Sequence, residues 1–187
     1  MEEIIRIDRE LFCFLNGLNA AWLDPVVFWM TKTVVWLPLF ALLFWLVYRK
    51  YGLRKTLWIL AFIAVIIVIG DQLANLVKMA VQRLRPTYDP DICPVHIVNG
   101  YKGGQFGFYS SHASNTFAIA VFLWIILYRY YRWIPALVLT WALVHSYTRI
   151  YLGVHFPADL LTGMLAGSIL GLIFGLAFRW MDRKVSD

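Results

Sequence analysis

Residues 57–77 read LWILAFIAVIIVIGDQLANLV and carry a single charged side chain, Asp71. A helix that crosses a bilayer needs about 20 mostly apolar residues. Similar apolar runs occur elsewhere in the chain, at 34–48, 113–128, 133–152 and 158–178. A shorter run at 25–31 either extends the first of these or adds a sixth span. We therefore predict an all-α transmembrane helical bundle of five to six spans.

The composition agrees with a membrane protein. Hydrophobic residues make up 61% of the chain and charged residues 15%, against roughly 45–50% and about 25% in soluble domains. These values exclude a disordered chain, a disulfide scaffold and an ordinary soluble enzyme. The 187 residues suit one domain, and we predict a single membrane-embedded domain over residues 1–187.

The N-terminal segment has a different pattern. Apolar residues within 4–18 are spaced for one face of a helix, which predicts an amphipathic helix lying on the membrane interface. Glu2 and Glu3 stand where a signal peptide carries basic residues, so we expect no cleaved targeting segment.

Basic residues in short loops predict the orientation. They gather in the 48–55 loop, the 128–132 turn and the tail from Arg179, which alternating spans place on one side. The positive-inside rule makes that side the cytoplasm. The N-terminal helix, the 78–112 segment and the 149–157 turn then lie outside.

The formal net charge is +6, but the basic residues form no stripe, so we expect no nucleic-acid partner. Several cations occupy the outer side, where the positive-inside rule disfavours them: Lys78, Arg83, Arg85, Lys102 and Arg149. An anionic ligand on that side would explain their position.

The chain has two cysteines, Cys13 in the predicted interfacial helix and Cys93 in the long external segment. Because they lie in unlike elements, we expect two unpaired thiols, and a disulfide between them is the alternative.

The last span carries a glycine at every fourth position, at Gly163, Gly167, Gly171 and Gly175. Small residues at this spacing let helix backbones approach closely in lipid. We predict close packing inside the bundle, with a dimer interface as the alternative.

Three polar clusters lie at predicted span ends, where ionisable residues indicate function. The first contains Lys78 and, later in the chain, Arg85-Pro86, two cations able to hold an oxyanion. Pro86 is predicted to end the helix and place Arg85 in the loop. The helix has one polar face, at Asp71, Asn75, Lys78 and Gln82. The alternative is that both cations snorkel to lipid headgroups.

The second cluster, Ser110-Ser111-His112, comes directly before an apolar run. Serine at this place predicts a helix N-cap, and the free N–H groups of a helix N-terminus form an anion site. His112 in the first turn could then protonate a leaving group. The alternative is an ordinary cap beside a solvated histidine.

The third cluster contains Arg149, His155, Pro157 and Asp159. Pro157 suits the first position of a helix, so His155 precedes the last span and Asp159 lies in its first turn. A carboxylate there can hold Nδ1–H of His155 and leave Nε2 free as a base or nucleophile. Arg149 supplies a planar fork for phosphate. The alternative is an aspartate that stabilises the helix beside a surface histidine.

Two further histidines receive no role. We expect His96 to be a loop residue. His145 lies one turn before Arg149 and could face the site, but we expect a hydrogen-bonded histidine inside the bundle.

Taken together, these clusters resemble the motifs of the type 2 phosphatidic acid phosphatase family, which shares its site with the vanadium haloperoxidases. The family pattern is Lys-x6-Arg-Pro, then Pro-Ser-Gly-His, then Ser-Arg-x5-His-x3-Asp, and the counterparts here lie in order within 78–159. The departures are Tyr109 for Pro, Ser111 for Gly and Thr148 for Ser. They remove no charged or titrating group, so we expect them to affect substrate preference rather than activity.

The resemblance implies a phosphatase that needs no metal and no cofactor. His155 would be the nucleophile and form a phosphohistidine, Asp159 would orient it, and His112 would protonate the leaving group. The phosphate-binding residues would be Lys78, Arg85, Ser110, Ser111 and Arg149.

The resemblance also implies a membrane lipid phosphate as substrate, either a phosphomonoester or a diphosphate. We favour undecaprenyl diphosphate or lipid A over phosphatidylglycerol phosphate and phosphatidic acid. The expected location is a bacterial inner membrane, with the site facing the periplasm or cell exterior. The alternatives are a lipid phosphotransferase that uses the same intermediate, and an anion transporter or channel, whose flux would survive His155→Ala.

Overall fold

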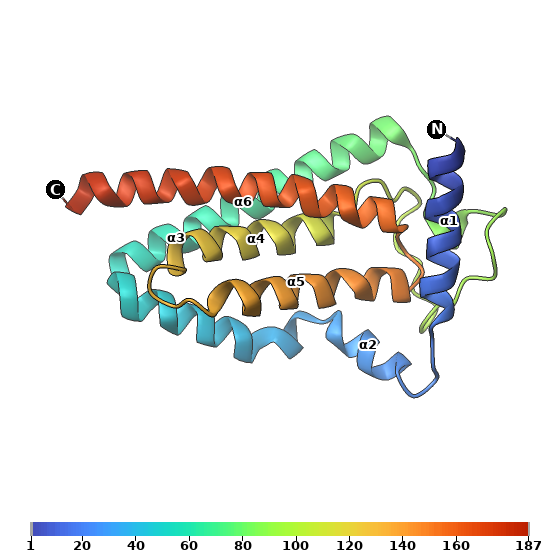
Figure 1. Ribbon diagram of the computed structural model, residues 1–187, viewed down its shortest axis with the longest axis horizontal. Helices are drawn as coiled ribbons and strands as arrows, with labels where there is room; N and C mark the ends of the chain where they lie inside the picture. Colours follow the sequence, from blue (N-terminus) through green and yellow to red (C-terminus); the bar gives the residue numbers. More distant parts are fainter. Residues whose placement is uncertain (1, 187) are drawn as a thin grey trace.

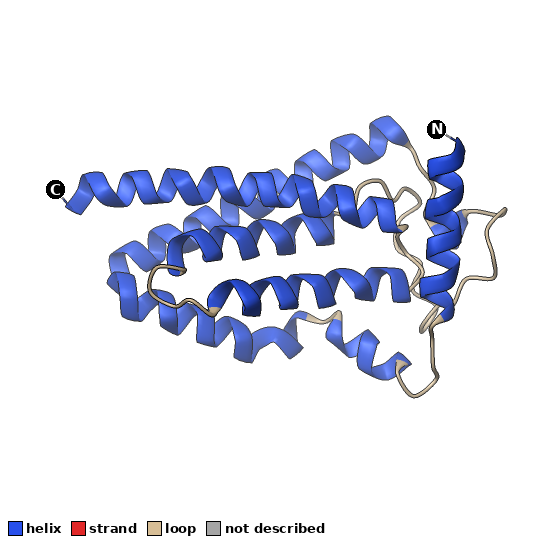
Figure 2. Ribbon diagram, viewed as in Figure 1, coloured by secondary structure: helices blue, strands red, loops and turns tan. Residues whose placement is uncertain are grey.

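The computed structural model describes residues 2–186, with side chains described for residues 2–184. Within them the chain is helical, without strands (Figure 2). The α-helices are α1 (Glu2–Gly17), α2 (Asp24–Met30), α3 (Leu37–Val81), α4 (Ser111–Leu127), α5 (Ile134–Tyr151) and α6 (Pro157–Ser186). Two short 3₁₀ turns are η1 (Thr33–Trp36) and η2 (Pro86–Tyr88). The all-α prediction is confirmed.

Among the described residues, two helical segments are long and apolar enough to cross a membrane, Thr33–Val81 and Pro157–Lys184. Ser111–Leu127 is also apolar but is shorter than these two segments. The helices α3 to α6 run along the long axis of the molecule (Figure 1).

The second predicted span and all but the first three residues of the first belong to α3, and the loop predicted over 48–55 is wrong. The backbone is helical on both sides of Gly52, which alone departs from helical geometry, with φ of 68°. Glycine adopts positive φ without the steric cost of a Cβ, so the chain reverses at one residue. From this reversal the two halves of α3 diverge (Figure 1).

The bundle has two unlike ends (Figure 1). One end, the turn end, holds the Gly52 reversal, the turn after α4 and the C-terminal part of α6. The other end, the loop end, holds α1 and the long loop between α3 and α4. The basic segments named above therefore share one end, as the alternation of spans predicted.

The four glycines of α6 pack against α4, which confirms the predicted close packing inside the bundle. A Cβ on Gly163 would meet the backbone oxygen of Ser110, and one on Gly167 would overlap the backbone of Ser114. Gly171 faces the backbone of Ala118 in the same way. We call this contact the glycine seam.

The helix α1 crosses the loop end of the bundle (Figure 1). The face that it buries contains Asp8, Phe12 and Asn16, whereas Ile4 is 71% exposed and Leu11 is 42% exposed. The helix is amphipathic as predicted, but its buried face is partly polar. That face is stable because its polar groups have partners: Asn16 Nδ2 donates to two backbone oxygens near the end of α5, at 2.9 and 3.0 Å.

Cys13 and Cys93 form a disulfide, so the expectation of two unpaired thiols is wrong. The expectation failed because α1 lies across the loop that carries Cys93, a contact that the order of elements does not reveal. An ion pair between Arg9 and Asp89, at 2.7 Å, joins the same two segments.

Candidate functional site

The first cluster lies where α3 ends, but the helix ends earlier than predicted. It stops at Val81 because Gln82 takes a left-handed conformation with φ of 51°, and Pro86 only begins a later 3₁₀ turn. Lys78 therefore lies in the last turn of α3. Arg85 is in extended backbone, as predicted.

Both cations of this cluster donate hydrogen bonds to the segment that leads into α4, residues 105–111. Lys78 Nζ donates to Ser111 Oγ at 3.1 Å, and Arg85 Nε donates to the backbone oxygen of Phe106 at 3.1 Å. Arg85 also pairs through its backbone N–H with Gln105. The cations thus point back over the bundle rather than out to the lipid headgroups.

The second cluster caps α4, as predicted. Ser110 is the N-cap, and its Oγ accepts from Ala113 N at 3.4 Å. Its own backbone N–H donates to the backbone oxygen of Asp159 at 3.0 Å. This bond joins the starts of α4 and α6, so the second and third clusters meet.

The third cluster forms a buried histidine–carboxylate pair. His155 Nδ1 lies 3.3 Å from Asp159 Oδ2, and the two side chains are 1% and 0% exposed. The same Oδ2 accepts from Phe156 N at 3.0 Å. Pro157 is the first residue of α6, as predicted, which places Asp159 in the first turn.

The surroundings of His155 keep it uncharged. Burial lowers the pKa of His155 to about 4; the hydrogen bond that His155 donates to Asp159 opposes this shift, and the cations Arg85 and Lys78 add to it. Near neutral pH the imidazole is therefore neutral. Because the carboxylate accepts at Nδ1, the proton lies there and the lone pair lies on Nε2.

The remaining predicted site residues, Arg149 and His112, lie near His155. Arg149 is 3% exposed; its Nε donates to Thr148 Oγ1 at 3.2 Å, and its Nη2 is buried without a partner among the described residues. Electrostatic interactions join His112 to Arg149, Arg85 and His155. An unpaired guanidinium nitrogen beside two histidines is a ready site for an anionic oxygen.

His145 differs from its expectation. Its ring stacks on that of His112, with centroids 6.1 Å apart and planes 15° apart, and its Nδ1 is buried without a partner among the described residues. It therefore lies beside the site rather than being hydrogen-bonded away from it. His96 is a loop residue, as expected, and pairs with Asp24 at 2.8 Å.

Sequence reasoning missed two residues next to the His155–Asp159 pair, Arg83 and Gly107, and a third, Asp8, that reaches it through Arg83. Arg83 donates to Asp159, and Asp8 accepts from Arg83. A Cβ on Gly107 would lie 3.0 Å from Asp159 Oδ2 and 3.6 Å from His155 Nδ1. The only signal for Arg83 was its place among the outer cations, and nothing in the sequence connected it with Asp8.

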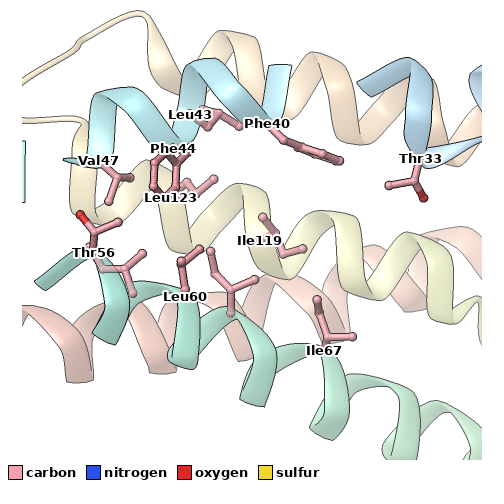
Figure 3. Close-up of a pocket in the computed structure, with 12 residues that line it drawn as sticks. Thr33, Phe40, Leu43, Phe44, Val47, Thr56, Leu60, Ile67, Ile119 and Leu123 are labelled. Atoms are coloured by element: carbon pink, nitrogen blue, oxygen red, sulfur yellow. The ribbon is translucent and has the colours of Figure 1, made fainter. Parts of the chain in front are cut away.

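An apolar cavity of about 380 Å³ lies between the two halves of α3 and against α4 (Figure 3). We call it the α3 wedge. Its lining comes from three helical segments, with Phe40, Leu43 and Val47, then Thr56, Leu60 and Ile67, then Ile119 and Leu123. His112 and Ile119 share one face of α4, so the lining residue Ile119 lies about 10 Å along the helix from the polar cluster.

Known proteins resemble this chain in sequence and in fold. A model of the PAP2 superfamily matches residues 56–185. A lipid A 4'-phosphatase of Bacteroides thetaiotaomicron is 38% identical over 87% of this chain and 73% of its own. An undecaprenyl-diphosphatase of Sulfolobus acidocaldarius is 27% identical over 87% of this chain and 74% of its own.

Among solved structures, LpxE of Aquifex aeolicus superposes with a TM-score of 0.67 and 25% identity, covering 88% of this chain and 92% of that one. The predicted class, a phosphatase that acts on membrane lipids, is confirmed at that level, as is an integral membrane protein. The family match extends over most of the chain and includes all three polar clusters, so the chain belongs to the PAP2 superfamily.

Proposed function

We propose that the chain hydrolyses a phosphate ester of a membrane lipid at the loop end of the bundle, through a phosphohistidine at His155. The observation that carries the proposal is the buried His155–Asp159 pair, whose histidine is neutral and surrounded by cations. A neutral imidazole with its lone pair on Nε2 is a nucleophile, and the cations supply the charge that a phosphoryl group needs.

The reaction proceeds in two displacements. In the first, Nε2 of His155 attacks phosphorus, the bond from phosphorus to the lipid oxygen breaks, and His112 gives that oxygen a proton. In the second, a water molecule gives a proton to His112 and attacks phosphorus. The phosphorus–nitrogen bond then breaks and inorganic phosphate leaves, with His155 neutral again. Asp159 holds Nδ1–H throughout and stabilises the positive charge on the ring.

The phosphoryl oxygens contact Lys78, Arg85 and Arg149. The free N–H groups at the start of α4 and the hydroxyls of Ser110 and Ser111 assist them. These groups neutralise the charge of the transition state without a metal ion or a cofactor. Ser111 also fixes the ammonium of Lys78, since the two side chains are hydrogen-bonded.

The α3 wedge supports a lipid rather than a soluble phosphate as substrate. Its lining is apolar, and one lining residue, Ile119, lies about 10 Å along α4 from His112. A lipid with its phosphate in the polar cluster can place part of an acyl chain in this space. Burial of each methylene contributes about 0.8 kcal/mol, although bilayer lipid offsets part of this gain.

A phosphomonoester on lipid A is the substrate that we favour. The support is the 38% identical relative that carries the name lipid A 4'-phosphatase. Undecaprenyl diphosphate comes next, because a more distant relative carries that name.

The proposed topology has five spans in one membrane-embedded domain. The two halves of α3 supply two, and α4, α5 and α6 supply one each. The helix α2, with 7 residues, is too short for a span. With the basic turn end in the cytoplasm, the site faces the periplasm of a bacterial inner membrane, and α1 lies on the outer interface.

The test is phosphate release in mixed micelles from four lipids: lipid A, undecaprenyl diphosphate, phosphatidylglycerol phosphate and phosphatidic acid. We expect release from lipid A above the other three, and its loss in His155→Ala. Equal release by wild type and His155→Ala would exclude the mechanism. Transfer that appears only when a second lipid is added would identify a phosphotransferase.

A further inference from the structure

Arg83 occupies an unspecified position of the first family motif, between Lys78 and Arg85, yet it contacts Asp159 of the histidine–carboxylate pair. Its Nη1 donates to Asp159 Oδ1 at 2.9 Å, and its Nη2 donates to Asp8 Oδ2 at 2.5 Å. The guanidinium lies over the ring of Phe156, 4.2 Å from its centroid. One planar side chain thus bridges two carboxylates that are far apart in the sequence.

Asp8 is built into this contact. Its side chain is 8% exposed, and its second oxygen, Oδ1, accepts from Ala158 N at 2.7 Å. The first N–H groups of a helix have no partner within the helix, so Asp8 of α1 caps α6 from another element. A buried carboxylate needs such partners, and here the guanidinium and the helix end supply them.

These contacts occupy both oxygens of Asp159. Oδ1 accepts from Arg83, while Oδ2 accepts from Phe156 N and lies against His155 Nδ1. With both oxygens engaged, the carboxylate cannot rotate about its Cβ–Cγ bond without breaking a hydrogen bond. The orientation of the His155 ring follows from the orientation of this carboxylate.

We propose that Arg83 and Asp8 are positioning residues of the phosphatase. They hold Asp159 so that it keeps the proton on Nδ1 of His155 and directs Nε2 toward the phosphate. This inference rests on the proposed role of His155 as nucleophile. A series of hydrogen bonds runs from Asp8 through Arg83 and Asp159 to His155. Because α1 supplies Asp8, the first residue of this series, α1 is then part of the site.

The surroundings of Arg83 separate it from the phosphate-binding cations. Its two terminal nitrogens, Nη1 and Nη2, already donate hydrogen bonds to the carboxylates of Asp159 and Asp8. It lines an outer cavity of about 820 Å³ together with Asp8 and Ala158. None of the proposed phosphate-binding residues lines that cavity. Loss of Arg83 should therefore lower kcat and leave KM nearly unchanged, whereas loss of a phosphate-binding cation should also raise KM.

The position of α1 does not depend on Asp8 alone. The Cys13–Cys93 disulfide and the Arg9–Asp89 ion pair hold it to the loop, and Asn16 holds it to the end of α5. A variant that changes only the Asp8 side chain should therefore leave α1 in place.

The experiment uses the full chain in detergent, with Asp8→Asn, Arg83→Gln and Arg83→Lys. Asn at position 8 can still accept from Ala158 N but carries no charge for Arg83. Asp89→Asn is the matched control. It removes the ion pair between Asp89 and Arg9 of α1 but leaves the hydrogen bonds from Asp8 through Arg83 and Asp159 to His155 unchanged. Steady-state kinetics give kcat and KM. The ¹⁵N chemical shifts of the His155 ring, in protein labelled at its 4 histidines, report which nitrogen carries the proton.

We expect Asp8→Asn and Arg83→Gln to lower kcat about 10- to 100-fold, the range seen when the partner that orients a metal-bound histidine is removed. The His155 resonances should shift toward a mixture of tautomers. Arg83→Lys should partly restore both kcat and the wild-type ring shifts of His155. Asp89→Asn should change neither kcat nor these shifts. Unchanged kcat and unchanged ring shifts in the first two variants would overturn the proposal, as would a raised KM with unchanged kcat.

The ring shifts are measured without substrate, so they test positioning even if the proposed function fails. Failure of the function would show itself differently, as wild-type protein that releases no phosphate or as full activity in His155→Ala. Unfolding temperatures of all four variants, measured in the same detergent, distinguish a positioning effect from a loss of folded protein.

Discussion

The helix α4 makes two unlike contacts, and the contrast between them separates the parts of the site. Toward α6 it forms the glycine seam, where backbones touch and Ala113 and Ala118 are fully buried. Toward α3 it borders the α3 wedge, an apolar cavity with exposed lining residues such as Leu60, 43% exposed. The glycine seam fixes the distance between α4 and α6, whereas the α3 wedge leaves an unfilled apolar space between α4 and α3.

Each contact agrees with the chemistry proposed beside it. His112 lies in the first turn of α4 and Asp159 in the first turn of α6, so the seam sets the distance between the proposed acid and the carboxylate that orients the nucleophile. Catalytic groups need positions fixed to a fraction of an ångström, and close backbone packing provides this. A lipid chain is flexible and needs only an apolar space.

The largest effect should come from Gly167→Ala in the seam. The added Cβ would overlap the backbone of Ser114, which cannot move aside as a side chain can. Overpacking costs about 1–3 kcal/mol or more, and because the starts of α4 and α6 would separate, phosphate release should be lost. The matched control is Gly175→Ala, whose Cβ has its nearest contacts, from 2.9 Å, with side-chain atoms of Ile125 rather than with backbone. Equal unfolding temperatures and equal activities for the two variants would contradict a rigid seam.

A smaller effect should follow from Leu60→Trp, which fills the α3 wedge. Displacing about two methylenes of a bound chain costs about 1.6 kcal/mol, which is about tenfold in kcat/KM. The loss should appear with a long-chain lipid and not with a short-chain phosphate ester. Leu57→Trp is the control, because Leu57 lies on the same half of α3 outside the wedge lining. A loss that is the same for both esters would show that the wedge holds no acyl chain.

In the site itself, at the start of α4, Ser111→Gly should have a modest effect. It restores the residue usual in the family and removes the hydroxyl that accepts from Lys78. A hydrogen bond of this kind is worth about 0.5–1.5 kcal/mol, so kcat/KM should fall by up to about tenfold. Ser111→Thr keeps the hydroxyl and should stay near wild type. If the glycine variant were the more active of the two, the proposed support of Lys78 would be wrong.

The smallest effect should be that of mild acid on His155, at the loop end of the seam. Its pKa is lowered from 6.5 to about 4, so in folded protein it stays neutral over that interval, whereas an unfolded histidine gains a proton. The unfolded state then binds more protons, and the free energy of unfolding decreases as pH falls from 6.5 toward 4. A ¹⁵N titration of the labelled histidines should show a neutral His155 ring at pH near 5; a midpoint near 6.5 would contradict its burial.

The sequence predicted the parts of the site that depend on local signals. Ser110 as a cap, Pro157 as a first helical residue and the spacing of His155 and Asp159 each follow from one helix end. The glycine seam followed from a repeat of four residues. These features need no knowledge of which helices are neighbours.

Features that depend on neighbours were missed. The contact from Asp8 through Arg83 to Asp159 joins α1, the loop after α3 and α6, and no spacing in the sequence connects them. The disulfide was missed for the same reason.

Two errors were local and arose from competing signals. Four basic residues suggested a loop over 48–55, but Gly52 alone reverses the chain. Pro86 was expected to end α3, but the left-handed Gln82 ends it earlier. In both places a single residue with positive φ determined the geometry.

The central claim is that His155 carries the phosphoryl group. The direct measurement is rapid quenching of wild-type protein with its lipid substrate during turnover, followed by proteolysis and mass spectrometry. The account predicts one added phosphoryl group on the peptide that contains His155, absent from His155→Ala and from wild-type protein without substrate. Normal phosphate release with no phosphorylated histidine, or with the group on another residue, would contradict it.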